Sequence, residues 1–111
     1  MADVVVSCPK AAWQTWSEQA ASGLVVFDLG YRLPGKWNPG DRVYVVAHGR
    51  VRCWMELGKV GHDPITGQLQ LVLIGQPLPV TTSEEIRGFQ GARMRWWPRD
   101  QERDFPGWRE P

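Results

Sequence analysis

The sequence predicts an α+β fold: a small bent or barrel-like sheet of about five or six mixed strands, with one main helix after the first strand. Short β-rich runs recur along the 111 residues, and the stretch Val43–Val60 reads as two such runs joined by a tight turn. A single helical pattern, Pro9–Ala21, separates the first two runs. Because a two-stranded ribbon is not stable alone, the other runs must join the hairpin in one sheet.

Length and composition place the chain among single-domain soluble proteins. Its 111 residues, 42% of them hydrophobic, can bury a core without disulfides or metal. No apolar run approaches the ~20 residues that span a bilayer, and Met1–Asp3 lacks the basic start of a signal peptide. We therefore expect a cytoplasmic protein with no membrane association, in which Cys8 and Cys53 are reduced. Neither the cysteines nor His48 and His62 have metal-ligand spacing, so no cofactor is expected.

The first unit is a strand followed by an amphipathic helix. Val4–Cys8 reads as a short buried strand that ends before a proline. Within Pro9–Ala21, Trp13 and Trp16 recur at helical spacing, and Ser22-Gly23 closes the helix. We expect both indoles to face the core, because large aromatic side chains contribute most buried area in a small domain.

A second apolar run, Leu24–Asp28, leads into an irregular segment rich in Gly and Pro. This segment carries Tyr31, Arg32, Lys36 and Trp37 within a few residues. Aromatic and basic side chains interleaved on a loop can stack on bases and contact phosphates. The alternative is an ordinary loop whose aromatic side chains pack downwards.

The hairpin follows a turn at Asn38–Asp41, where Pro and Gly preset the backbone. Gly49-Arg50 is expected to be the hairpin loop, with glycine in the first central position of a type II′ turn. In the second strand Val51, Cys53 and Met55 alternate with polar or larger residues, so they are expected to form its buried face.

The remaining elements are less regular. Gln68–Gly75 is predicted to be a strand, Val80–Arg87 a short helix or turn capped by Thr82 or Ser83, and Ala92–Trp97 the last strand. In that strand, alternation predicts Ala92, Met94 and Trp96 inward, and Arg93, Arg95 and Trp97 outward. Residues 1–98 form the predicted domain. Residues 99–111 form a polar tail that folds back loosely or frays, with Phe105 and Trp108 as its anchors.

The charge pattern excludes a strongly basic protein but is uneven. The net charge is +1, and all positive charge after Lys59 is arginine. No acid lies between Arg87 and Arg99. Arginine suits phosphate and base-edge contacts, so this stretch predicts a nucleic-acid-binding face. A solvated surface strand is the alternative.

Several of these segments together resemble a known family. The run Gly40–Val46, its hairpin, the strand at Leu69–Val72 and the exit Gln76–Thr81 are similar to the EVE domain, a member of the PUA-like superfamily with the YTH and ASCH domains. The resemblance covers roughly residues 4 to 97. It implies a pseudo-barrel with a pocket near one end, in which relatives hold a modified or extruded base against aromatic side chains.

The resemblance also implies the site residues. Ser7, Phe27, Asp28 and the surroundings of Trp54 are the positions that would form the base pocket, with Tyr31 as a further aromatic side chain. The basic residues expected to bind phosphate are Arg32, Lys36, Arg93 and Arg95.

Three functions compete at this point. The first is a nucleic-acid-binding module, for DNA or RNA, that reads a modified or extruded base. The second is a small ASCH-like hydrolase acting on a modified nucleoside, with Asp28, Glu56 and Lys36 as the candidate residues. The third is a protein-interaction domain that uses exposed Trp and Arg. Affinity for nucleic acid should fall steeply with salt, and affinity at an apolar interface much less.

Overall fold

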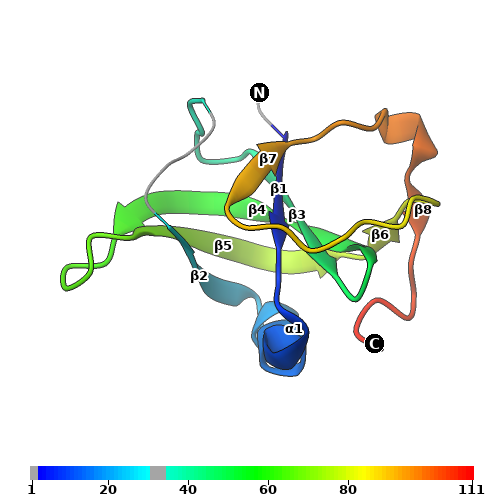
Figure 1. The fold of residues 1–111 in the computed structure, drawn as a ribbon, viewed down its shortest axis with the longest axis horizontal. Coiled ribbons are helices and arrows are strands. Elements are labelled where there is room, and N and C mark those ends of the chain that lie inside the picture. Colours follow the sequence, from blue (N-terminus) through cyan, green and yellow to red (C-terminus); the bar gives the residue numbers. More distant parts are fainter. Residues whose placement is uncertain (1–2, 31–34) are drawn as a thin grey trace.

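A computed structural model of the chain describes residues 3–30 and 35–111. In this described part, six strands form one sheet in the order β2-β5-β4-β3-β1-β7, and two short strands pair beside it (Figure 1). The strands are β1 Asp3–Ser7, β2 Leu24–Gly30, β3 Arg42–Ala47, β4 Arg50–His62, β5 Leu69–Leu78, β6 Val80–Thr81, β7 Ala92–Met94 and β8 Arg103–Asp104; the helices are α1 Trp13–Ala21 and the 3-10 turns η1 Lys10–Ala12 and η2 Arg99–Gln101.

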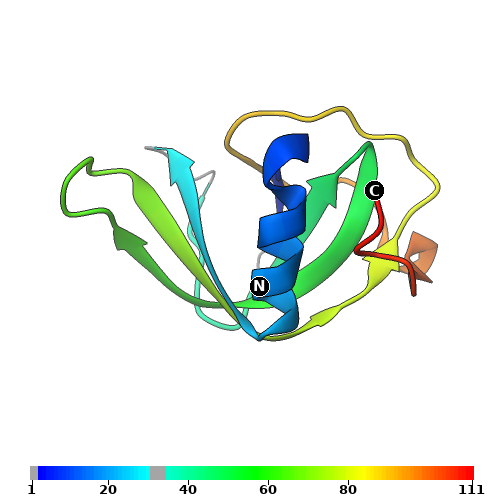
Figure 2. The same ribbon diagram turned by 90° about the horizontal axis from the view of Figure 1, so that it is seen from below.

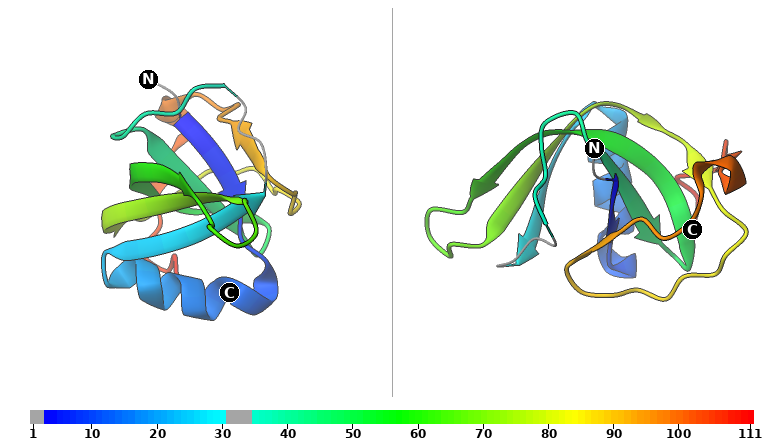
Figure 3. Two further views of the ribbon diagram at one scale, coloured as in Figure 1. Left: turned by 90° about the vertical axis from the view of Figure 1, so that its left-hand side faces the viewer. Right: turned by 90° about the horizontal axis from the view of Figure 1, so that it is seen from above.

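The sheet is mixed and curls into a half-barrel (Figures 2 and 3). β1 runs parallel to β3, and the other neighbours in the sheet are antiparallel. The register shifts within the β3–β4, β4–β5 and β2–β5 pairs, and such bulges bend and twist a sheet. The predicted mixed sheet with one main helix after the first strand is confirmed.

Helix α1 lies inside the curve of the sheet (Figure 2). Trp13 and Trp16 are 2% and 6% exposed, and their rings stack with centroids 5.6 Å apart. Both indoles therefore face the concave core, as the helical spacing predicts. The strand residues in that core include Val4, Val6, Val25, Val43, Val45, Cys53, Met55, Leu57, Leu71 and Leu73.

The other face of the sheet is covered by the irregular chain after β6. Val5, Tyr44 and Val46 pack there with Ile86 and Trp97. The predicted short helix at Val80–Arg87 is wrong: β6 is followed by a segment without regular structure as far as residue 91. The Thr82 hydroxyl makes no capping hydrogen bond. The Ile86 N–H instead donates to the Gly49 carbonyl at 2.7 Å, so contacts with the hairpin fix this segment.

The hairpin loop differs from the predicted one by a single residue. Ala47 and Arg50 are register partners, so the loop is His48-Gly49. Both loop residues have positive φ, 49° and 81°, as in a type I′ turn rather than the predicted type II′ turn. His48 thus holds a left-handed conformation that few side chains adopt.

The last strand of the sheet is shorter than predicted, and its alternation is wrong. β7 ends at Met94, beyond which the Arg95 N–H donates to the Asp3 carbonyl at 2.9 Å. Met94 and Trp96 are 46% and 41% exposed, whereas Trp97 is 4% exposed and contacts Tyr44 edge-on. Met94 is exposed because β7 is the last strand in the sheet order. Trp96 and Trp97 lie beyond β7, where the period of two no longer applies.

The C-terminal segment packs back on the domain. β8 pairs with β6, and Phe105 and Trp108 join the concave core, so both predicted anchors make contacts. The Trp13 Nε1–H donates to the Arg109 carbonyl at 3.0 Å, and the Arg52 guanidinium donates to the Glu110 carbonyl. A boundary at residue 98 stays a prediction, and these contacts define a test of it.

Both cysteines are buried free thiols, and burial raises the pKa of Cys8 to about 11. Burial raises the pKa of Cys53 further, with a smaller contribution from Cys8. Within residues 3–30 and 35–111, no helix combines the length and the apolar character needed to cross a membrane.

Candidate functional site

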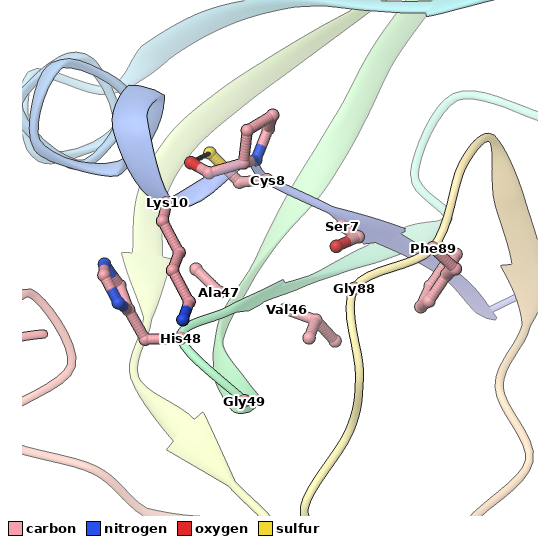
Figure 4. Close-up of a pocket in the computed structure, with 10 residues that line it drawn as sticks. Ser7, Cys8, Lys10, Val46, Ala47, His48, Gly49, Gly88 and Phe89 are labelled. Atoms are coloured by element: carbon pink, nitrogen blue, oxygen red, sulfur yellow. Dashed lines mark hydrogen bonds between the residues drawn. The ribbon is translucent and has the colours of Figure 1, made fainter.

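The strand pair β1 and β3 places several loops at one edge of the sheet. Since the two strands are parallel, Ser7 and Ala47 end them side by side, and the Cys8 N–H continues the ladder to the Val46 carbonyl at 2.8 Å. A cavity of about 250 Å³ opens at this edge (Figure 4). We call it the Lys10 cavity; its lining consists of Ser7–Lys10, Val46–Gly49, Gly88 and Phe89.

A second cavity, of about 360 Å³, lies where the edge strand β2 faces the chain that enters β7. We call it the Phe27 cavity; its lining consists of Ser7, Pro9, Phe27–Gly30, Gln68 and Phe89–Gly91. The two cavities share Ser7, Pro9 and Phe89 in their walls, so they lie next to each other.

Three of the predicted pocket residues meet in the Phe27 cavity: Ser7, Phe27 and Asp28. Phe27 is half-buried and packs on the concave core, and the Asp28 carboxylate accepts a hydrogen bond from Gln70 Nε2 at 3.0 Å. Phe89 also lines this cavity and was not identified from the sequence. The sequence feature that could have identified Phe89 is its place as an aromatic residue between two glycines, Gly88 and Gly91.

The other predicted pocket residues do not join this cavity. Trp54 lies on β4 and packs against the cluster on the outer face of the sheet that contains Tyr44 and Trp97. The Arg42 guanidinium lies 4.2 Å from the Trp54 ring centroid. Tyr31 and Arg32 lie outside the described residues. Lys36 is exposed and lines neither cavity.

The predicted arginine face is divided by the structure. The Arg93 guanidinium lies 4.4 Å from the ring centroid of Phe89, a residue that lines both cavities. The Arg95 guanidinium instead binds the buried Asp3 carboxylate at 2.9 Å, and Trp97 is buried. Arg93, Arg95 and Trp97 therefore do not form the continuous exposed stripe that alternation predicts.

Lys10 and His48 are the basic residues that line the Lys10 cavity, and Figure 4 shows their side chains next to each other. Neither side chain makes a hydrogen bond or ion pair within the described residues, and no carboxylate lines this cavity. Sequence reasoning missed both residues. Spacing along the chain could not pair a residue before the helix with one in the hairpin loop.

The three residues considered for hydrolysis do not converge. Asp28 lines the Phe27 cavity near the end of β2, whereas Glu56 is level with Ile74 and Leu24, at the start of β2. Lys36 lines neither cavity. In the described part of the chain, no three His, Cys, Asp or Glu side chains are grouped so that they could hold a metal ion.

Comparison with known proteins does not add a family. No family model matches the sequence, and neither curated proteins nor solved structures give a match. The residues that line the two cavities are therefore the basis for a functional proposal.

Proposed function

We propose that the protein is a nucleic-acid-binding module that holds one base in the Phe27 cavity. The observation that carries this proposal is the meeting of Ser7, Phe27, Asp28 and Phe89 around one hollow at the open side of the sheet. Two aromatic side chains offer stacking surfaces for a base. A carboxylate and a hydroxyl can accept and donate hydrogen bonds at the base edge.

The volume of the Phe27 cavity supports the same proposal. Pockets that hold small ligands usually measure ~300–1,000 Å³, and this cavity measures about 360 Å³. It is thus large enough for one flat heterocycle and too small for a stretch of duplex. Recognition of a single base outside a stack follows, in the manner of a flipped or single-stranded nucleotide.

The basic rim supports binding of the backbone. Arg93 is exposed beside Phe89, and Lys10 and Arg87 lie at the neighbouring cavity walls. Within the described residues none of the three is paired with a carboxylate. Free cations next to an aromatic slot suit phosphates that flank a bound base.

Replacing Phe27 tests the slot. Phe27→Ala should weaken binding of the preferred short oligonucleotide by roughly 1–3 kcal/mol, because one stacking surface is lost, and should remove the preference between bases. Val26→Ala is the matched control, because Val26 is the neighbouring residue and is 52% exposed, outside the cavity lining. Fluorescence anisotropy with modified and unmodified oligonucleotides measures both variants. Equal affinities for Phe27→Ala and Val26→Ala would contradict the slot.

Arg93→Ala, measured at several salt concentrations, separates the backbone contact from stacking. It should weaken all oligonucleotides alike and flatten the salt slope by about one unit, as expected for one lost phosphate contact. A salt slope identical to that of the wild type would show that Arg93 only covers Phe89.

One observation favours a second candidate, a protein-interaction surface. Met94 and Trp96 are 46% and 41% exposed next to Arg93, and Trp, Met and Arg are enriched at interfaces. Such a surface would bind its partner with little dependence on salt. Affinity that is insensitive to salt and is lost in Trp96→Ala would favour this candidate over nucleic acid.

A further inference from the structure

We propose that Lys10 and His48 form a phosphate-binding subsite in the Lys10 cavity, backed by the buried guanidinium of Arg52. This inference rests on the proposed function, because it assigns the phosphate that lies beside the base in the Phe27 cavity. It differs from the prediction made from the sequence, which gave that role to Arg32, Lys36, Arg93 and Arg95.

Arg52 carries a buried positive charge that no carboxylate of the described residues balances. Its side chain is only 3% exposed. Its guanidinium donates to the carbonyls of Ala47 at 2.8 Å and His48 at 3.3 Å, and to that of Glu110. No carboxylate pairs with it among the described residues. Carbonyl oxygens satisfy donors but carry no net charge, so a positive charge remains directly behind two residues of the cavity wall.

The groups that line the cavity are suited to phosphate. Lys10, His48 and Ser7 are part of its wall, and none of these side chains makes a hydrogen bond or ion pair within the described residues. Figure 4 shows the Lys10 side chain extending toward His48, with the imidazole on the side of Lys10 that is away from Ser7. A long cation, an imidazole and a hydroxyl are groups that bind phosphate oxygens. Lys10 and His48 also line two adjoining hollows, one with Glu85 and one with Glu18 and Glu110. Neither cation forms an ion pair with these carboxylates within the described residues.

The backbone of His48 has a positive φ. A histidine with φ of 49° occupies a turn position that glycine or asparagine holds with less strain. Such outliers persist where the surrounding structure fixes them, and they cluster at functional sites. The hydrogen bond from Arg52 to the His48 carbonyl is one such constraint, and it orients the loop that carries the imidazole.

Size decides which part of a nucleotide enters this cavity. At about 250 Å³ the Lys10 cavity is smaller than the Phe27 cavity of about 360 Å³, and Ser7, Pro9 and Phe89 line both. The smaller cavity has the cations and the larger one the aromatic walls. A nucleotide therefore fits with its base against Phe27 and Phe89 and its phosphate between Lys10 and His48.

Titration with inorganic phosphate, followed by backbone amide chemical shifts, tests the subsite without any nucleic acid. Saturable shifts are expected at Lys10, His48 and Gly49. Lys10→Gln and His48→Asn should each weaken phosphate binding by about tenfold or more, the effect of one lost charge-assisted contact. Asparagine tolerates the left-handed turn, so His48→Asn should fold, and Lys10→Arg should keep most of the affinity. Lys59→Gln is the control, since Lys59 is exposed on β4 outside this cavity.

The same variants with a short oligonucleotide separate this inference from the proposed function. Phosphate binding that depends on Lys10 and His48, with no oligonucleotide binding at all, would support the subsite as a site for free phosphate and overturn the nucleic-acid function. Oligonucleotide binding that maps to Phe27 but is unchanged in Lys10→Gln and His48→Asn would overturn the subsite and leave the function standing. Phosphate shifts that are equal in Lys59→Gln and Lys10→Gln would also overturn it.

Discussion

Deleting residues 105–111 is expected to lower the free energy of unfolding by about 4 kcal/mol or more. Trp108, 9% exposed, and Phe105 both pack in the concave core, and removing a large buried aromatic side chain costs about 3–5 kcal/mol. The deletion also removes the acceptors of two buried donors, Trp13 Nε1 and the Arg52 guanidinium, at roughly 1–3 kcal/mol for each unsatisfied group. A small domain has only about 5–15 kcal/mol of stability, so the shortened chain should be partly unfolded.

Urea unfolding of the 111-residue chain and the shortened chain measures this loss. Arg109→Ala is the control, because the Arg109 carbonyl accepts the Trp13 hydrogen bond and its side chain is exposed. This variant should stay within about 0.5 kcal/mol of the wild type. If the shortened chain is as stable as Arg109→Ala, the last residues are a separate tail, and the predicted domain boundary at residue 98 is correct.

Asp3→Asn should have the second largest effect, a loss of about 3 kcal/mol. The Asp3 carboxylate is buried and pairs with Arg95 at 2.9 Å and with Arg99 at 2.8 Å. Removing one partner of a buried ion pair typically costs 3–5 kcal/mol, because the remaining charge loses its compensation. The two guanidiniums are 22% and 45% exposed and can regain water, which places the loss near the lower end of that range.

The loss in Asp3→Asn should be concentrated at the edge of the sheet. Among the described strands, β7 pairs only with β1, and Arg95 fixes the chain just beyond it. Amide hydrogen exchange should therefore accelerate first in Ala92–Met94. Asp100→Asn, at an exposed acid of η2, is the control. Equal stability of the two variants would mean that the Asp3 pairs contribute nothing.

The sequence pattern predicted the elements in which apolar residues form a clear run or recur at regular spacing. The helical spacing of Trp13 and Trp16 placed both indoles in the core, and the runs Val4–Cys8 and Gln68–Gly75 became strands of the sheet. These predictions succeed because an apolar face must be buried wherever the element packs.

Contacts between distant parts of the chain decided the rest. Arg95 and Trp97 were expected on a solvent-exposed strand face, but the Arg95 guanidinium binds the buried carboxylate of Asp3, 92 positions away, and Trp97 is buried. Arg52 was read as the polar side of a strand and is buried, because the C-terminal segment returns to accept its hydrogen bond. The candidate site has the same origin: Lys10, His48 and Phe89 come from three separate segments, and no spacing in the sequence relates them.

Mapping the amide chemical-shift changes caused by a short single-stranded oligonucleotide tests the central claim most directly. The account predicts saturable changes in residues that line the two cavities, namely Ser7, Cys8, Lys10, Phe27, Asp28, His48, Gly49 and Phe89, that weaken as salt is raised. Changes confined to Met94 and Trp96, or no changes at low salt with any oligonucleotide tested, would contradict it.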